Sequence, residues 1–343
     1  MNNSIMKSLD GPDMYYENKL VALQRIFGSK DLSLEGTVLR VAGRRYPIID
    51  DVIVLLDTSQ YTPYVISRLG AVPAGGDARP SFAEDIQFTF GAEWQKFGQV
   101  MFEHKEEFEQ YFDLVDDNLL SGCVCDLGCG IGRWSYFIAD KCREAVLIDF
   151  SDAIFVARRN LKNADNALFF MADLTSLPFA SGFADFIFCL GVLHHLPVPA
   201  LEQVRKLGKY ADSLLIYLYY ALDNRPWYFR MLLPPITVAR SLLSRIRSHM
   251  FRSLFSWLGA VLIYRPLVLV GGLCKKLGIN MHIPLAEGYA GKGIERIRQD
   301  VYDRFFTRIE QRVSKSEIMK LRDTYRTITV SDNIPYWHFL CKK

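Results

Sequence analysis

The feature that most constrains the fold is a series of apolar segments that alternate with helical segments from residue 122 to about residue 220. The apolar segments include CVCDLG, AVLIDFS, LFFMAD and FADFIFCLG, and most of their polar residues stand at the end. Helical segments such as AIFVARRNLKN and PALEQVRKLGKY stand between them. Apolar strands that alternate with helices form a parallel sheet with both faces covered. We therefore predict an α/β fold with a doubly wound sheet.

Residues 301–343 resume this pattern after a long interruption. SKSEIMKLRDTY is predicted to be helical, with Ser314 and Glu317 at the spacing of a capping box. TITVS and YWHFLC then read as two strands with only DNIP between them. Such a short connection predicts a hairpin, so the last strand should run antiparallel to its neighbours.

A glycine-rich turn, Asp126 to Gly132, follows the first apolar strand and is expected to open a helix. Glycines at Gly128, Gly130 and Gly132 allow a tight turn and a close approach of the backbone to a nucleotide. Asp149 ends the second strand, where a carboxylate can accept both hydroxyls of a ribose. These features predict a nucleotide site at the carboxyl end of the sheet.

Four segments in this order resemble the class I S-adenosylmethionine-dependent methyltransferases of the small-molecule type. VCDLGCGIGRW is similar to their first motif, LIDFS to the acidic loop after strand two, ADLTSLPF to the adenine loop, and FADFIFCLGVLHHL to the strand-four segment. The resemblance covers about residues 85–220 and again 305–343. It implies a Rossmann-like sheet of seven strands with a reversed last strand.

The resemblance also implies a cofactor, S-adenosylmethionine, and the residues that hold it. The methionine part would lie on the glycine turn, the ribose on the acidic end of strand two, the adenine on the third loop, and the strand-four end along the cofactor. The implied residues are, in that order, Asp126, Gly128, Gly130 and Gly132; Asp149 and Phe150; Asp173 and Leu174; Leu190 and Gly191. A dehydrogenase is the alternative, but a pyrophosphate would disfavour the Asp126 charge near the loop.

Candidate catalytic groups are His194 and His195, because imidazole titrates near neutral pH and can remove a proton from a nucleophile. The alternative is that the pair starts a helix and packs near the cofactor. Trp94 precedes the core, where an aromatic ring can cover a sulfonium cation, although ordinary packing explains it equally well.

Residues before the final helix are candidates for binding the acceptor. Tyr302, Arg304 and Arg308 suit an acceptor that bears a carboxylate or a phosphate. The alternative is a solvated charged face. Family members often carry a histidine in this neighbourhood, whereas here Gln311 stands near the expected place, which weakens the case for a second base.

The insertion at residues 224–300 has an unusual charge distribution. Residues 224–286 contain nine Lys or Arg and no Asp or Glu, which leaves 32 basic and 38 acidic residues for the rest of the chain. Drawn as one helix, residues 238–257 place apolar side chains on one face and basic side chains on the other. The following apolar run is broken by Arg265 and Pro266, so we expect two short helices there. Residues 236–275 then form a hydrophobic lid, a contact with a membrane surface, or a membrane span, in decreasing order of preference.

The N-terminal segment, residues 1–80, contains RRYPIIDDVIVLLD, which resembles the second half of a small zinc-ribbon module. No cysteine precedes Cys123, so the resemblance implies a degenerate module without metal. The chain thus divides into this appendage, a methyltransferase core at 81–223, the insertion at 224–300, and the end of the core at 301–343.

The remaining features concern location and function. The seven cysteines form no CxxC pair, and the N-terminus has no apolar signal region, so we expect a cytoplasmic protein, possible membrane contact being at the inner face. We expect methyl transfer to oxygen, rather than nitrogen or carbon, of a small-molecule or lipid-linked acceptor. The alternatives are a membrane-recruited binding protein without turnover and an RNA methyltransferase, and no DNA partner is expected because the net charge is only +3.

Overall fold

The computed structural model describes residues 14–70 and 103–343, which form two compact units. The first unit combines the described part of residues 1–80 with residues 116–189 and 206–214. The second comprises the described part of 81–115, together with 190–205 and 215–343. Trp94 lies outside the described residues.

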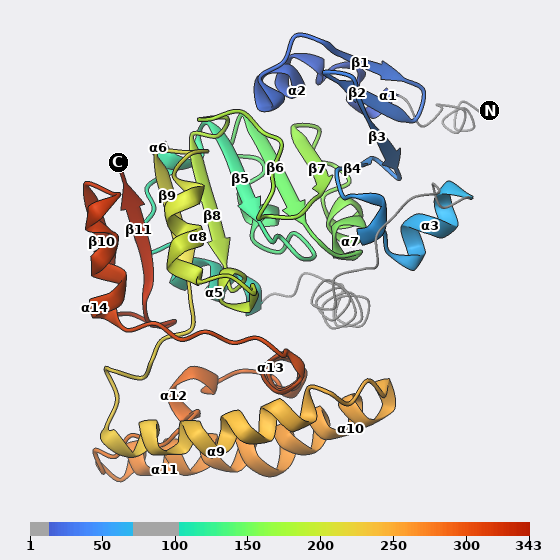
Figure 1. Ribbon diagram of the computed structural model, residues 1–343. Coiled ribbons are helices and arrows are strands. Elements are labelled where there is room, and N and C mark those ends of the chain that lie inside the picture. The colour runs from blue at the N-terminus through green and yellow to red at the C-terminus, as the bar shows by residue number, and fades with distance from the viewer. Residues whose placement is uncertain (1–13, 71–102) are drawn as a thin grey trace, which may run out of the picture. The chain divides into compact units, whose positions relative to one another are not determined.

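The first unit is built on parallel strands that consist mainly of apolar residues, and Figure 1 shows them side by side. Because every residue of β5 (Cys123–Leu127), β7 (Ala167–Met171) and β8 (Phe186–Leu190) is buried, these strands lie inside the sheet. With β6 (Glu144–Asp149) they take the order β7-β6-β5-β8. The strand order continues with β9 (Ser213–Tyr217), β11 (His338–Lys342) and β10 (Thr327–Val330).

The strand order β7-β6-β5-β8-β9-β11-β10 agrees with the predicted Rossmann-like sheet of seven strands. The reversed last strand is confirmed, because β10 and β11 pair antiparallel with Thr327 opposite Lys342. The capping box also forms at α14 (Lys315–Ile318), which continues as the 3₁₀ helix η5 (Met319–Asp323).

The N-terminal segment adds four more strands to the sheet of the first unit. β1 (Leu32–Glu35), β2 (Val38–Val41) and β3 (Arg44–Ile49) form an antiparallel meander, and β4 (Val52–Val54) pairs parallel with β7. The residues TVLRVAGRRYPII form two strands, β2 and β3, because Ala42 and Gly43 turn the chain with positive φ. The pairing of β4 with β7 makes the appendage part of the core sheet.

Short helices connect the strands along the chain. In the N-terminal segment they are α1 (Met14–Glu17), α2 (Leu20–Phe27), the 3₁₀ helix η1 (Thr58–Gln60) and α3 (Pro63–Leu69). Further along the chain they are α5 (Glu103–Tyr111), α6 (Asp117–Leu120), α7 (Ala153–Asn160), η3 (Leu193–His195) and α8 (Ala200–Leu207).

The helix expected directly after the glycine turn does not form, and that prediction is wrong. Only the 3₁₀ helix η2 (Ser135–Phe137) follows. The residues there are aromatic and β-branched, with weak helix propensity, and Gly130 and Gly132 both hold a left-handed φ that a right-handed helix excludes.

The insertion of the second unit is a group of helices that pack on one another: α9 (Trp227–Leu243), α10 (His249–Gly259), α11 (Arg265–Lys276), α12 (Ala286–Tyr289) and α13 (Ile294–Phe306). Their core consists of Ala260, Tyr264, Tyr289, Ile297 and Val301. A Cβ on Gly259 would lie 3.0 Å from Val301, so this glycine permits the close crossing of α10 and α13.

The expected single helix over 238–257 is interrupted at residues 244–248. Arg252 is almost fully buried, and its guanidinium donates to the carbonyls of Ser244 and Ile246 in this break. The two short helices expected around Pro266 are instead continuous, because the π-helical turn η4 (Ala260–Tyr264) joins α10 to α11. A π turn accommodates the missing proline N–H without ending the helix.

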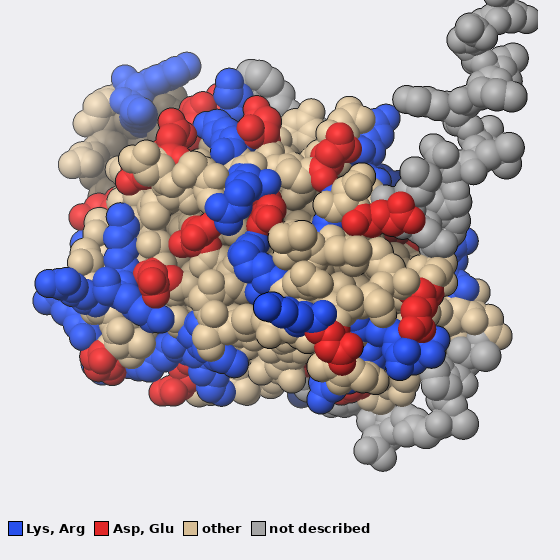
Figure 2. Space-filling model, turned by 90° about the horizontal axis from the view of Figure 1, so that it is seen from above, with Lys and Arg blue, Asp and Glu red and all other residues tan. Residues whose placement is uncertain are grey.

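Charges of both signs mix on the face of the molecule seen in Figure 2. Lys and Arg lie there among Asp and Glu rather than forming one continuous basic field. On this face, at least, the surface lacks the basic stripe of a nucleic-acid-binding protein.

Candidate functional site

The glycine turn of the first unit lies between the carboxyl ends of two parallel strands. Gly128, Gly130 and Gly132 all have positive φ, at 76°, 54° and 73°. The amide of Gly130 donates to Asp149 Oδ2 at 2.8 Å, so β6 holds the turn that follows β5. Gly132 has a packing role, since a Cβ there would lie 2.7 Å from Leu161 Cδ1.

Asp126 occupies the base of this turn as a buried carboxyl group. Its side chain is 2% exposed, and Ser135 Oγ donates to its Oδ2 at 2.8 Å. Burial, with a smaller effect from the charge of Asp149, raises the pKa of Asp126 to about 8, although the Ser135 hydrogen bond opposes the shift. A cationic ligand at this point would favour the ionised form.

Asp149 connects the turn to the next loop. Its Oδ1 accepts hydrogen bonds from the amide and hydroxyl of Ser151, at 2.8 and 2.7 Å, and its Oδ2 accepts from Gly130. Burial raises the pKa of Asp149, and these hydrogen bonds to Ser151 and Gly130 oppose the rise. Phe150 follows, half-buried, at the end of β6. Oδ1 already accepts two hydrogen bonds, whereas Oδ2 accepts one and retains lone-pair capacity for a ligand hydroxyl.

Asp173 follows β7 and is held in the same way. Its Oδ1 accepts from the amide and hydroxyl of Thr175, and Leu174 beside it is buried. Gln60 Nε2, from the N-terminal segment, donates to Asp173 Oδ2 at 3.3 Å. Sequence reasoning missed Gln60, because no local pattern indicates that β4 pairs with β7 and brings η1 to this loop.

The structure bonds Gly130 to Asp149 and places the charge of Asp149 near enough to affect Asp126, with Asp173 just after the adjoining strand β7. Leu190 and Gly191 stand at the end of β8. Leu190 is buried, and Gly191, at φ 81°, donates its amide to the Tyr217 carbonyl.

The two histidines lie after β8 in different surroundings. His194 is fully buried with no hydrogen bond to either ring nitrogen, and it stacks on Tyr219 at 3.9 Å between ring centroids. Burial and neighbouring positive groups hold the pKa of His194 well below its usual value. His195 Nδ1 lies 2.7 Å from the Ile309 carbonyl, and because a carbonyl oxygen only accepts, Nδ1 is the donor of this hydrogen bond.

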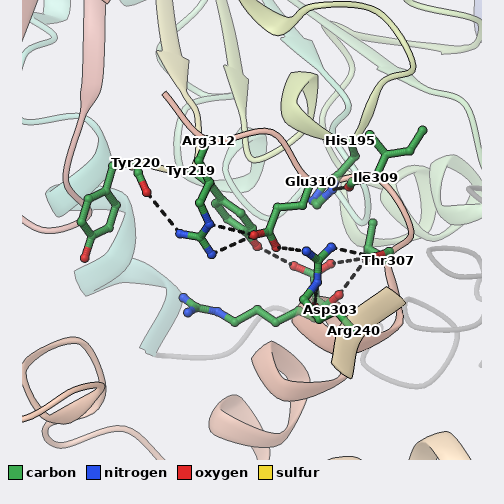
Figure 3. Close-up of polar contacts among 10 residues, drawn as sticks. His195, Tyr219, Tyr220, Arg240, Asp303, Thr307, Ile309, Glu310 and Arg312 are labelled. Carbon is green, nitrogen blue, oxygen red and sulfur yellow. Dashed lines mark hydrogen bonds and ion pairs between the residues drawn. The ribbon is translucent and has the colours of Figure 1, made fainter. Parts of the chain in front are cut away.

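Hydrogen bonds join the segment 309–312 to the segment that contains the two histidines. The Gln311 amide donates to the His194 carbonyl, and its side-chain Nε2 donates to the carbonyls of Leu196 and Val198. Figure 3 shows the neighbouring Glu310 between Arg240 and Arg312. The histidine pair thereby helps to position a network of charged side chains.

A cavity of about 1100 Å³ lies within the second unit. Tyrosines line one part of it, and apolar residues of the insertion helices line another. The tyrosines are Tyr111, Tyr217, Tyr219, Tyr220, Tyr264, Tyr289 and Tyr336; the apolar side chains include Leu232, Leu233, Ile236, Phe255, Ile263, Leu267 and Val268. Neither His194 nor His195 is among the lining residues.

Of the three residues predicted to bind the acceptor, Arg304 lines this cavity. Tyr302, on the same helix α13, is buried against Phe306, and Arg308 is exposed outside the cavity wall. The additional polar residues of the wall, among them Tyr219, Arg240 and Glu310, were not predicted, because the long insertion separates them in sequence.

Within the described residues, no group of three or more His, Cys, Asp or Glu side chains is arranged to hold a metal ion.

Comparison with known families assigns a class to this site. Residues 124–209 match the model of a methyltransferase domain. The match includes all of β5 except its first residue, together with the glycine turn, Asp149, Asp173 and both histidines. No curated protein matches the chain.

Solved structures show a partial likeness. A putative methyltransferase from Bacillus halodurans is 15% identical, with a TM-score of 0.33, and the alignment covers 40% of this chain and 60% of that protein. Magnesium protoporphyrin IX methyltransferase from Synechocystis, solved with bound S-adenosylhomocysteine, is 20% identical over 75% of this chain and 95% of its own, with a TM-score of 0.41. Mitomycin 7-O-methyltransferase is 13% identical over 77% and 61%, with a TM-score of 0.42.

The chain therefore carries a methyltransferase domain of the S-adenosylmethionine-dependent class, as its motifs predicted. The predicted cofactor, S-adenosylmethionine, is confirmed with the class. The residues present fit this cofactor, because a buried carboxyl with a raised pKa at the glycine turn complements a ligand that carries a sulfonium and an ammonium group.

Proposed function

We propose that the protein transfers a methyl group from S-adenosylmethionine to an oxygen of a small-molecule or lipid-linked acceptor. The single observation that carries the acceptor part of this proposal is the cavity of the second unit, which has room for an organic molecule and polar groups to orient it. When bound, the cofactor supplies a methyl group activated by the sulfonium. The work of the chain is then to bind and align.

In this proposal the first unit binds the cofactor through its three carboxylates. Asp126 would face the methionine part, Asp149 the ribose and Asp173 the adenine. Gly130 supports the assignment to Asp149, because its amide fixes the carboxylate at the edge of the turn. Replacing Asp149 removes this anchor and the hydroxyl acceptor at once.

We assign the histidines a positioning role instead of the role of general base. The pKa of His194 lies well below its usual value, and neither imidazole lines the cavity. The Nδ1–H group of His195 donates to the Ile309 carbonyl and so fixes the segment 309–312, which carries Glu310 and Arg312. An acceptor oxygen that is already ionised needs no base, which is consistent with O-methylation of an acid group.

Calorimetric titration of the Asp149→Ala variant with S-adenosylmethionine tests the cofactor assignment. We expect binding to be lost, because the variant lacks both the ribose acceptor and the bond to Gly130. Asp140→Asn, an exposed change in the same unit, is the matched control and should bind as the wild type does. Unchanged affinity of Asp149→Ala would overturn the assignment.

A second proposal concerns the insertion, which we infer contacts the surface of an anionic membrane, at the inner face for a cytoplasmic protein. Twenty large apolar side chains between Trp227 and Met281 are exposed, and residues 224–286 contain no acidic residue. The helical stretch His249–Lys276 has the length and the apolar composition of a membrane span, and only 22% of its most apolar window is buried. Exposed apolar and basic side chains together favour an interfacial contact.

Vesicle co-sedimentation tests this second proposal. The protein should sediment with phosphatidylglycerol vesicles and less with phosphatidylcholine vesicles, and the double substitution Met250→Ser and Trp257→Ser should weaken binding. Met250 is 81% exposed and Trp257 45% exposed, so the fold should tolerate the change. Absence of sedimentation at low salt would exclude the contact.

A further inference from the structure

The acidic groups of the cavity wall are all engaged by basic or phenolic partners. Glu107 pairs with Lys292 at 2.7 Å and Arg296 at 2.9 Å. Glu310 pairs with Arg240 at 3.2 Å and Arg312 at 2.8 Å. The other two acids are likewise bonded: Asp300 to Arg296 and Tyr289, and Glu287 to Arg225 and Tyr336.

The basic groups of the wall outnumber these acids. Seven Lys or Arg residues line the cavity, against four Asp or Glu residues. Because each acid is already bonded, the excess of positive charge in the described wall falls on residues without an ion partner. The most enclosed of these is Arg304, on the helix α13.

The guanidinium of Arg304 makes no hydrogen bond or ion pair with any described residue, although its backbone carbonyl accepts from Arg240 Nε. The rings of Tyr219 and Tyr289 both have centroids 5.8 Å from the guanidinium carbon. The charge of Arg304 contributes to the lowered pKa of Asp300, but the carboxylate of Asp300 bonds elsewhere. A part-buried guanidinium with five donors unused is a strong site for a carboxylate or phosphate.

The opposite part of the wall is apolar. Leu232, Leu233 and Ile236 come from α9, and Phe255, Ile263 and Leu267 come from the helical stretch that runs through α10, η4 and α11. These side chains cannot satisfy a polar ligand group, so this part of the cavity suits hydrocarbon.

We infer that the acceptor is an anionic amphiphile, with its carboxylate or phosphate on Arg304 and its apolar part among the α9 and α10–α11 side chains. The inference rests on the proposed methyl transfer and names the substrate class of that cavity. A cationic ligand would meet the uncompensated guanidinium, and a small anion without an apolar part would leave the hydrocarbon wall unfilled.

Calorimetric binding of laurate to the full chain tests this inference. Laurate should bind, whereas acetate and dodecyltrimethylammonium should not, because one lacks the apolar part and the other carries the wrong charge. Arg304→Gln should weaken laurate binding at least tenfold, as expected for the loss of a charge-assisted hydrogen bond. Arg304→Lys should retain most of the affinity. Arg326→Gln, an exposed change outside the cavity, is the control and should bind as the wild type does.

Equal binding of laurate and dodecyltrimethylammonium, or an unchanged laurate affinity in Arg304→Gln, would overturn the inference. Vesicle binding distinguishes the source of the ligand. If Arg304→Gln also weakens sedimentation with phosphatidylglycerol vesicles, the anion is a lipid headgroup; if sedimentation is unchanged, it is a free amphiphile. Titration of the wild type with S-adenosylmethionine distinguishes failure of this inference from failure of the proposed function. If the cofactor binds but laurate does not, only the substrate class is refuted. If the cofactor does not bind, the proposed function is refuted.

Discussion

Asp126→Asn is expected to stabilise the free protein while it weakens cofactor binding. The raised pKa, about 8 against an ordinary 3.8, means that the folded protein holds this carboxyl neutral where the unfolded chain ionises it. The stability from neutral Asp126 is therefore fully present below pH 3.8 and is lost as the pH rises towards 8. Asparagine is neutral throughout and retains an oxygen that can accept from Ser135.

The magnitude follows from the size of the shift. One pKa unit corresponds to about 1.4 kcal/mol. At pH 7 the raised pKa of Asp126 therefore lowers the unfolding free energy of the wild type by about 4 kcal/mol, and the variant escapes this loss. Between pH 5 and pH 8 the gain of the variant should grow by a similar amount. Urea unfolding at these two pH values measures it, as a midpoint shift on the order of 1 M or more.

Two results would refute this reasoning. A gain that is equal at pH 5 and pH 8 would mean that Asp126 titrates normally, and a loss of stability would mean that its ionised form is needed for the fold. Asp140→Asn is the exposed control and should show no such growth with pH. Calorimetry at pH 7 in two buffers, phosphate and Tris, measures the protons released when the cofactor binds. The wild type should release up to about one proton, and Asp126→Asn should release none from this site.

Two further substitutions test the positions of other residues. His195→Asn can still donate a hydrogen bond to the Ile309 carbonyl, so turnover of an identified acceptor should stay within about tenfold of the wild type. A loss of about a hundredfold or more would instead assign His195 the role of general base. Gly132→Ala should lower the unfolding free energy by about 1–3 kcal/mol, because it combines a positive φ with a clash at Leu161. Gly43→Ala, with a positive φ but no neighbour within 4 Å, should cost less in the same urea assay, and equal losses would contradict the packing role.

The sequence predicts those parts of the fold and site that local chemistry determines. Asp126, Asp149 and Asp173 each stand at or just after the end of an apolar strand, and parallel strands bring such ends to one edge of a sheet. The hairpin at the end of the chain follows from its short connection. Gln60 could not be predicted, because its approach to Asp173 depends on the distant pairing of β4 with β7.

The insertion shows the limit of helical periodicity. A helical projection places Arg240 and Arg252 on a solvent-facing basic side, but both are buried and donate to backbone carbonyls at helix ends. Those carbonyls lie at the end of α13 and in the break after α9, where they have no partner within a helix. That two arginines supply the missing donors becomes visible only once the helices are packed. The apolar side chains of the same helices are consequently left at the surface, as with Leu254.

The most direct test of the central claim is calorimetric titration of the full chain with S-adenosylmethionine, S-adenosylhomocysteine and NAD in parallel. The account predicts micromolar binding of the first two and none of the third, because the buried carboxyl of the glycine turn can ionise beside a cationic ligand, whereas a pyrophosphate would disfavour that ionisation. Binding of NAD alone, or of none of the three to protein shown to be folded, would contradict the assignment of a methyl-donor site.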